Sequence, residues 1–229
     1  MKRWLALLTA LAALWAVGCD ALPGRPDPAE RYRRPTEIVD FETLYARNCS
    51  GCHGATGRLG PARPLADPLY LAYAGATHLR QIVAEGVPGT SMPAFGQADG
   101  GLLTDAQIDA LVQGSFEHWG DASKLEGVPL PAYTASTGNP AGGEVAFASF
   151  CADCHGADGS GGKRGGSVVD PDFLALVSDQ MLRTSVVAGR PDLGMPDWRK
   201  LAGRPMQAQE INDVVAWMAA RRTRFPEPH

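Results

Sequence analysis

One short pattern occurs twice in this chain of 229 residues, and it restricts the possible folds more than any other feature. The segments 49–53 (CSGCH) and 151–155 (CADCH) each contain two cysteines, separated by two residues, and a histidine directly after the second cysteine. A longer match follows each copy: LRQIVAEGVPGTSMPAF starts at Leu79 and LRTSVVAGRPDLGMPDW starts at Leu182. Because corresponding residues lie 102 or 103 positions apart, each copy is long enough to be a domain rather than one unit of a solenoid.

A Cys-x-x-Cys motif by itself has several possible uses, including a zinc site, a redox disulfide and haem attachment. A zinc site shared by four cysteines needs pairs about 15–20 residues apart, which is far less than the separation here. Structural disulfides of such short span close very small loops and stabilise little. A thioredoxin-like motif needs a βαβ context, which this sequence lacks. None of these uses explains why a histidine follows both pairs.

Covalent attachment of haem explains the complete pattern. Cysteines three positions apart on a helical turn lie on the same face, from which their thiols can reach two vinyl groups on one edge of a porphyrin. The next residue then directs its imidazole toward the iron. We therefore predict two covalently attached haem c groups. Their attachment residues and first iron ligands are Cys49, Cys52 and His53 in one copy and Cys151, Cys154 and His155 in the other.

A Met-Pro pair follows each motif at a matched distance. Met92 lies 39 residues after the histidine of the first motif, and Met195 lies 40 residues after that of the second. A thioether is a neutral ligand that raises the potential of haem iron, so we predict Met92 and Met195 as the second iron ligands. His78 and His118 are also conceivable ligands, but we expect a packing role for His78 and a helix C-terminal position for His118.

The N-terminal segment has the shape of a secretory signal. Lys2 and Arg3 precede an apolar run, 4–17, that is too short for a comfortable membrane span. The run ends in AVGC, which resembles a bacterial lipobox and makes Cys19 the expected lipid anchor. An ordinary cleaved signal and an uncleaved anchor are the alternatives. In each case the body of the protein is exported, and we expect it at the periplasmic or outer face of the cell membrane.

Each copy is predicted to be all-α, because apolar residues recur at helical spacing and no convincing strand pattern appears. Thr77 is the expected N-cap of one helix and Gly86 its end, while Thr104 and Gln107 form the capping box of another. The expected helices span residues 40–49, 77–86 and 104–116 in the first copy and 143–151, 178–189 and 210–222 in the second. The predicted parts of the chain are a signal peptide (1–18), a proline-rich tether (19–36), domain 1 (37–118), a linker (119–139), domain 2 (140–224) and a tail (225–229).

With these motifs the sequence resembles the class I c-type cytochromes twice over, across residues 37–118 and 140–222. The resemblance implies two tandem cytochrome c class I domains, each of a few short helices around one covalent haem. It also implies that the first and last helices of each domain cross beside the haem. The tandem arrangement is similar to dihaem cytochromes c and to the dihaem subunits of haem–copper oxidases.

The helix crossing of the first copy departs from the family pattern. In the family, a small residue eight positions before the first cysteine usually meets an aromatic residue on the last helix. The second copy has this pair as Gly143 and Trp217, whereas the first copy has Phe41 and Gly114 at the corresponding positions. Since cores tolerate volume-conserving exchanges best, we expect this crossing to keep its volume with the large and small partners exchanged.

The loop after the histidine also differs between the copies. The family often has a proline there whose carbonyl orients the imidazole, and Pro61 has this place in the first copy. Lys163 takes the aligned position in the second copy, within the glycine-rich loop 161–166. Because groups that hydrogen-bond a metal ligand tune the metal, we expect the two haems to differ in potential. We expect another carbonyl of that loop to hold His155.

Electron transfer is the predicted function, rather than catalysis, because iron with both axial positions filled has no site for a substrate. The expected donor and acceptor are redox proteins in membrane complexes of a respiratory or photosynthetic chain. The formal net charge of −4 argues against nucleic acid as a partner. The alternative is a haem enzyme, peroxidase-like or oxidising a sulfur compound, in which one methionine ligand is labile. Near the C-terminus, Arg221, Arg222 and Arg224 either dock an acidic partner or complement a helix end.

Overall fold

The structure is a computed structural model that describes residues 27, 32–125, 129–134 and 136–223. The chain separates into two compact units, Met1–Glu37 and Ile38–His229, and both Cys-x-x-Cys-His motifs lie in the second unit. The predicted signal peptide, the expected lipid anchor Cys19 and the C-terminal tail lie outside the described residues. Within the described part, no helix is both long and apolar enough to cross a membrane.

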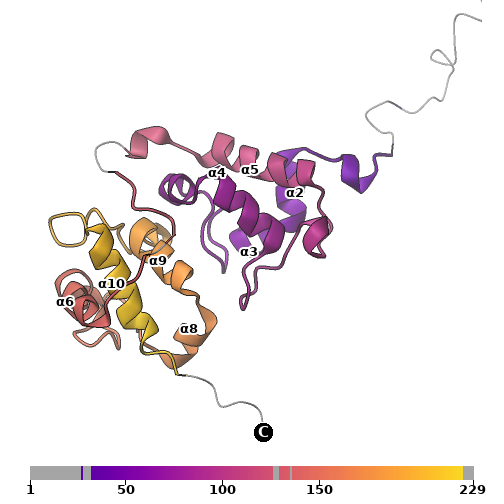
Figure 1. Cartoon of the computed structure of the whole chain (residues 1–229). Helices are drawn as coiled ribbons and strands as arrows, with labels where there is room; N and C mark the ends of the chain where they lie inside the picture. Colours follow the sequence, from indigo (N-terminus) through magenta and orange to yellow (C-terminus); the bar gives the residue numbers. More distant parts are fainter. Residues whose placement is uncertain (1–26, 28–31, 126–128, 135, 224–229) are drawn as a thin grey trace, which may run out of the picture. The chain divides into compact units, whose positions relative to one another are not determined.

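Helices build both copies of the repeat (Figure 1). The first repeat contains α2 (Phe41–Asn48), α3 (Ser50–His53), α4 (Pro68–Glu85), η4 (Gln97–Asp99), α5 (Asp105–Trp119) and η5 (Ala122–Leu125). The second repeat contains α6 (Pro140–Phe150), α7 (Ala152–His155), α8 (Pro171–Leu176), α9 (Asp179–Ala188), η6 (Pro191–Leu193) and α10 (Ala208–Ala219). The described residues of the first unit include the short helix η3 (Pro35–Glu37). The described residues form isolated β-bridges but no strand, so the all-α prediction is confirmed.

The predicted capping box of α5 is present. The Thr104 hydroxyl accepts a hydrogen bond from the backbone N–H of Gln107, and the Gln107 side chain accepts one from the backbone N–H of Thr104. The apolar face that follows this cap, Ile108, Leu111 and Val112, is buried as expected. The cap therefore fixes the start of the last helix of the first repeat, and the buried face fixes how it packs.

Helix α4 begins earlier than the sequence pattern predicts. Its N-cap is Asp67, whose carboxylate accepts a hydrogen bond from the backbone N–H of Leu69 (3.0 Å). The prediction of Thr77 as the N-cap is wrong, because the helical conformation starts at Pro68 and the residue that divides α4 into two segments, with non-helical φ and ψ of 68° and 162°, is Gly75. Only glycine adopts that conformation at little cost. The predicted end of the helix at Gly86 is confirmed.

The first and last helices of each repeat cross through a close contact at a glycine. In the second repeat α6 packs against α10, and Gly143 lies against the Trp217 side chain and the backbone one turn before it. In the first repeat α2 packs against α5, and a Cβ atom at Gly114 would overlap the ring of Phe41. The expected exchange of large and small partners is therefore confirmed.

The first repeat has Gly114 where the second has Trp217, but a different tryptophan, Trp119, packs in the corresponding region. Trp119, at the end of α5, packs edge-on against Tyr45 with ring centroids 5.0 Å apart, and its ring covers Gly57. In the second repeat Trp217 stacks on Phe147, with centroids 4.3 Å apart, and covers Gly159 in the same manner. In both repeats a tryptophan thus packs on the loop after the Cys-x-x-Cys-His motif, although the two tryptophans do not align in sequence.

The segment between the repeats is packed against both of them. The hydroxyl of Tyr73 in α4 donates to the carbonyl of Tyr133 (3.1 Å), and Gln180 in α9 donates to the same carbonyl (3.0 Å). Arg183, also in α9, donates to the carbonyl of Ala132 (2.8 Å). Leu130 and Tyr133 are partly buried against the core, so this part of the linker is packed.

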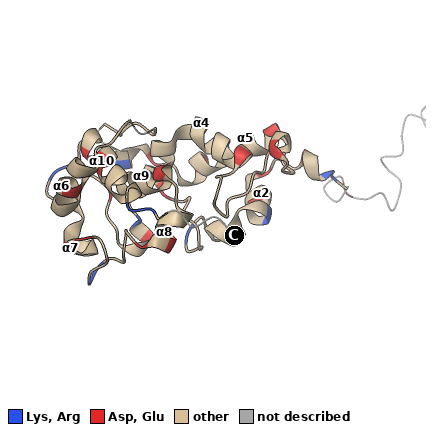
Figure 2. Ribbon diagram, turned by 60° about the horizontal axis from the view of Figure 1, so that its bottom comes forward, with Lys and Arg blue, Asp and Glu red and all other residues tan. Residues whose placement is uncertain are grey.

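Charged residues of both signs occur in both repeats (Figure 2). At the end of α10, Arg221 donates to the carbonyl of Trp217 (2.8 Å) and its guanidinium lies 3.6 Å from the centre of that ring. Arg222 donates to two carbonyls at the end of α8 and pairs with Asp179 at the start of α9. These contacts favour the helix-end role for both residues. Arg224 lies outside the described residues.

Candidate haem sites

Each Cys-x-x-Cys-His motif forms a single helical turn. The backbone N–H of His53 donates to the carbonyl of Cys49, and that of His155 donates to the carbonyl of Cys151, both at 3.0 Å. This turn holds the two cysteines of each motif on one face. The four cysteines of the two motifs are free, so neither pair is a disulfide in this structure.

A backbone carbonyl orients the imidazole of His53. Nδ1 lies 2.7 Å from the carbonyl oxygen of Arg63, and because a carbonyl only accepts, Nδ1 carries the proton. Nε2 then keeps the lone pair that a metal needs. Burial lowers the pKa of His53, although the hydrogen bond to Arg63 acts in the opposite direction. The neutral, ligating form of the imidazole is therefore favoured.

The orienting carbonyl is not the one that the sequence predicted. Pro61 is exposed, and the carbonyl that reaches the imidazole is that of Arg63, two residues further along. The backbone N–H of Ala62 donates to the carbonyl of Cys52 (2.9 Å). This bond ties the loop to α3 at residue 62, so the next carbonyl is the one that reaches His53.

In the second repeat a carbonyl of the glycine-rich loop orients the imidazole of His155. His155 Nδ1 lies 2.7 Å from the carbonyl oxygen of Gly166, which confirms the expectation that the glycine-rich loop holds this ring. The loop passes very close to the histidine: a Cβ atom at Gly165 would lie 2.8 Å from Nδ1 of His155. A side chain at position 165 would therefore displace the imidazole or the loop.

The two predicted methionine ligands lie in loops that are built alike. Each loop begins at a glycine that ends a helix, Gly86 after α4 and Gly189 after α9. The residue after that glycine donates its backbone N–H to the methionine carbonyl, at 3.0 Å for both Met92 and Met195. Both methionines are half-buried. The bond back to the helix end holds each loop in a closed shape.

The donor chemistry fits haem c in both repeats. Each repeat supplies two free thiols on one turn, a histidine with Nδ1 engaged and Nε2 available, and a half-buried thioether. Burial raises the pKa of Cys49 to about 11 and that of Cys151 to about 12. Both thiols are therefore protonated at neutral pH in this structure. No group of three or more His, Cys, Asp or Glu among the described residues is arranged to hold a metal ion.

The other two histidines considered as ligands have different partners. His118 Nδ1 donates to the carbonyl of Gly114 (2.9 Å) and its Nε2 lies 3.0 Å from a carboxylate oxygen of Glu42. Both ring nitrogens are therefore engaged at the end of α5. His78 Nδ1 donates to the carbonyl of Ala74 (3.0 Å), and the ring packs on Tyr133 with centroids 4.3 Å apart. The expected helix-end and packing roles are confirmed.

The family described as "Cytochrome C oxidase, cbb3-type, subunit III" matches residues 36–113 and 138–218, which cover both repeats. The chain belongs to this family. It is a class I c-type cytochrome, and the family implies covalently bound haem c. Each matched segment contains one complete Cys-x-x-Cys-His motif and the methionine that follows it.

Two curated relatives of this cytochrome are larger proteins. The Cbb3-type cytochrome c oxidase subunit CcoP of Azospirillum sp. (strain B510) is 29% identical over 176 residues, which are 69% of this chain and 54% of that protein. The thiosulfate dehydrogenase of Stutzerimonas stutzeri (strain A1501) is 33% identical over 134 residues, or 54% of this chain and 42% of that protein. The chain spans about half or less of the length of the curated relatives that it matches.

A solved structure shares the fold. A chain of the reducing HAO-like protein complex of Kuenenia stuttgartiensis aligns with a TM-score of 0.50 and 14% sequence identity, over 84% of this chain and all of that one. At this identity the similarity concerns the fold alone.

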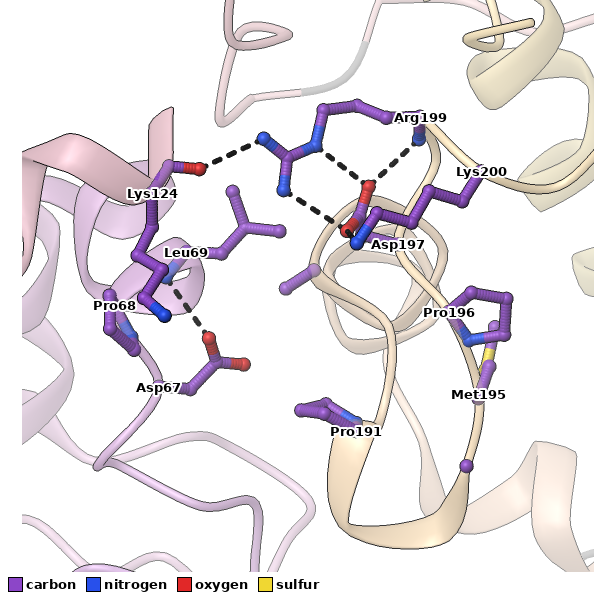
Figure 3. A pocket seen from close by; sticks show the side chains of 12 residues that line it. Asp67, Pro68, Leu69, Lys124, Pro191, Met195, Pro196, Asp197, Arg199 and Lys200 are labelled. Carbon is purple, nitrogen blue, oxygen red and sulfur yellow. Dashed lines mark hydrogen bonds and ion pairs between the residues drawn. The ribbon is translucent and has the colours of Figure 1, made fainter. Parts of the chain in front are cut away.

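The cytochrome has a cavity of about 580 Å³ between its repeats, beside Met195 (Figure 3). Asp67 and Lys124 line it from the first repeat. Arg199 on the other side forms an ion pair with Asp197 (2.9 Å) and donates to the carbonyl of Lys124 (3.0 Å). The Oδ2 atom of Asp67 is buried without a hydrogen-bond partner among the described residues. No pattern in the sequence indicates this cavity, because its walls come from segments far apart in the chain.

Proposed function

We propose that this chain is a dihaem c-type cytochrome that carries electrons between redox proteins. One haem c would be attached through Cys49 and Cys52, and the other through Cys151 and Cys154. One observation, made in both repeats, carries the proposal. Beside two free thiols, the Nδ1–H group of the motif histidine donates a hydrogen bond to a backbone carbonyl at 2.7 Å, which leaves Nε2 available for iron.

The proposed iron ligands are His53 with Met92 in the first repeat and His155 with Met195 in the second. Haem c supplies a reversible one-electron change between ferric and ferrous iron. The residues of the chain fix the ligands, exclude water and set the potential. The two carbonyls that hold the histidines come from loops of different composition, which supports different potentials at the two sites.

We further propose that the protein is exported and held at a membrane surface by lipid on Cys19. The support is the composition of residues 1–19. The similarity to a cbb3-type oxidase subunit favours a membrane redox complex as one partner. A tethered cytochrome would then exchange electrons with partners at the same surface.

The test combines two measurements on the full chain, produced in a host that attaches haem to c-type cytochromes. Intact mass gives the number of covalent haems, and the near-infrared charge-transfer band of ferric protein gives the number of bound thioethers. We expect two haems and two equivalents of the band. M92A and M195A should each remove one equivalent. M206L, a volume-conserving change at a buried methionine outside the motifs, is the matched control and should remove none. One haem per chain would contradict the proposal.

A second candidate is a haem enzyme that oxidises a sulfur compound. The similarity to a thiosulfate dehydrogenase points to the same class of substrate. Two haems with only one equivalent of the near-infrared band, together with reduction of the protein by thiosulfate, would favour this candidate over the carrier.

A further inference from the structure

Arg63 connects the two repeats through its side chain. Its guanidinium donates to the carbonyl of Gly189 (3.1 Å) and to the hydroxyl of Ser185 (3.2 Å), both in the second repeat. The same guanidinium lies 5.4 Å from the centre of the Tyr70 ring. Arg63 is therefore held on the first repeat by an aromatic face and on the second by two hydrogen bonds.

Each end of Arg63 touches the structure around a proposed iron ligand. Its backbone carbonyl accepts the hydrogen bond from His53 Nδ1 at 2.7 Å. Its side chain binds Gly189, the residue at which the loop of Met195 begins. Arg190 and Met195 close that loop through two backbone hydrogen bonds of 3.0 Å. A displacement of Arg63 would therefore shift the imidazole of His53 in one repeat and the Met195 loop in the other.

The charge of Arg63 is not neutralised by an ion pair. Among the described residues, no carboxylate lies within ion-pair distance of this guanidinium. The carboxylates of Asp67 and Asp192 favour the protonated form of Arg63 and Arg190 opposes it, while Arg190 and Asp192 bind each other at 2.7 Å. Since a guanidinium stays protonated in proteins, a positive charge remains between the two sites. Ferric iron carries one more positive charge than ferrous iron, so this cation favours the reduced form at both sites.

We propose that Arg63 is a positioning residue that couples the two haem sites. It orients His53 through its carbonyl, holds the Met195 loop through its side chain, and raises both reduction potentials through its charge. This inference rests on the proposed dihaem function. Such a coupling is reciprocal, so reduction at the first site would change the electron affinity of the second by the same factor as the reverse.

The test is a spectroelectrochemical titration of the full, haem-loaded chain and of three variants. R63Q removes the charge and the guanidinium fork but keeps the backbone carbonyl. R63K keeps the charge. R58Q removes the same charge from an exposed position in the same loop. We expect R63Q to decrease the equilibrium constant for reduction about tenfold at each site, which is about 59 mV for one electron. R63K should change either constant less than threefold, and R58Q less than twofold.

A change at the first site alone in R63Q, or equal changes in R63Q and R58Q, would overturn the proposal. A structural role without coupling would lower the melting temperature but leave the second potential where it was. If R63Q does not load haem, S185A serves instead, because it removes one of the two acceptors of Arg63 in the second repeat and leaves Arg63 itself unchanged. S185A should then shift the second potential and the second near-infrared band, and no shift would also overturn the proposal. If the unaltered chain lacks two haems, it is the proposed function that fails.

Discussion

The ring of Phe41 on α2 fills the space that Gly114 leaves open on α5. The matching crossing in the second repeat has the opposite arrangement, with Gly143 on the first helix and Trp217 on the last. Both crossings bring two helices close together, but the bulk comes from different sides. The exchange explains why the two repeats can share a fold although the residues at this crossing differ in size.

A side chain added at position 114 should therefore destabilise the first repeat. G114L would force a leucine into the volume of the Phe41 ring, and overpacking of this kind costs about 1–3 kcal/mol. The double variant F41A/G114L should recover at least half of that loss, because it returns the volume. Urea unfolding followed by circular dichroism measures both. If the losses of F41A and G114L simply add, the two positions do not share one space.

Replacement of Trp119 should loosen the first repeat although the residue lies outside the aligned helix crossing. W119A removes the edge-on contact with Tyr45 and uncovers Gly57. Because Trp119 is only partly buried, we expect a loss of about 3 kcal/mol, at the lower end of the range for large aromatic truncations. W119F should lose only about half as much unfolding free energy as W119A. An unfolding free energy of W119A equal to that of the unaltered chain would show that the indole contributes nothing there.

The glycine-rich loop should tolerate a methyl group at one position and not at its neighbour. G165A would bring a Cβ atom to 2.8 Å from the ring of His155, whereas a Cβ at Gly166 has nothing within 4 Å. We expect G165A to change the visible spectrum and lower the potential of the second site, with the first site unaffected. G166A is the matched control and should leave both sites unchanged. Equal spectra for the two variants would contradict this packing argument.

The contact of His118 with Glu42 should make stability depend on pH. The carbonyl of Gly114 and the Glu42 carboxylate raise the pKa of His118 in the folded chain. The protonated histidine therefore stabilises the fold. This contribution is fully present below the unfolded pKa of about 6.5 and is lost as the pH rises through the folded value. The melting temperature of H118Q should fall below that of the unaltered chain at pH 5 and approach it at pH 9. A constant difference would mean that protonation is not involved.

The turns of the two Cys-x-x-Cys-His motifs could be predicted from sequence because their geometry is local. Two thiols and an imidazole on one turn need only five consecutive residues, and the structure forms that turn in both repeats. The capping box at Thr104 is local in the same way. The all-α fold followed from apolar spacing, which is a property of each helix by itself.

Other features depend on contacts between distant parts of the chain. The partners of the Arg63 guanidinium lie 122 and 126 residues away, so nothing beside it in the sequence marks its role. The role of Trp119 could not be predicted either, since the position that corresponds to Trp217 is Gly114, five residues earlier in the chain. The expected N-cap Thr77 lies inside the second helical segment of α4, because Asp67 caps the first segment and Gly75 separates the two.

The hydrogen bonds to the segment between the repeats bear on how such chains can be recombined. Tyr73 from the first repeat and Gln180 from the second bind the same carbonyl, that of Tyr133. The segment is thus a shared part of two neighbours rather than a free spacer. A chimera that exchanges one repeat for that of another cytochrome would have to bring residues 129–134 with it, or supply other donors for these carbonyls. The two repeats therefore depend on a common segment and are not interchangeable modules.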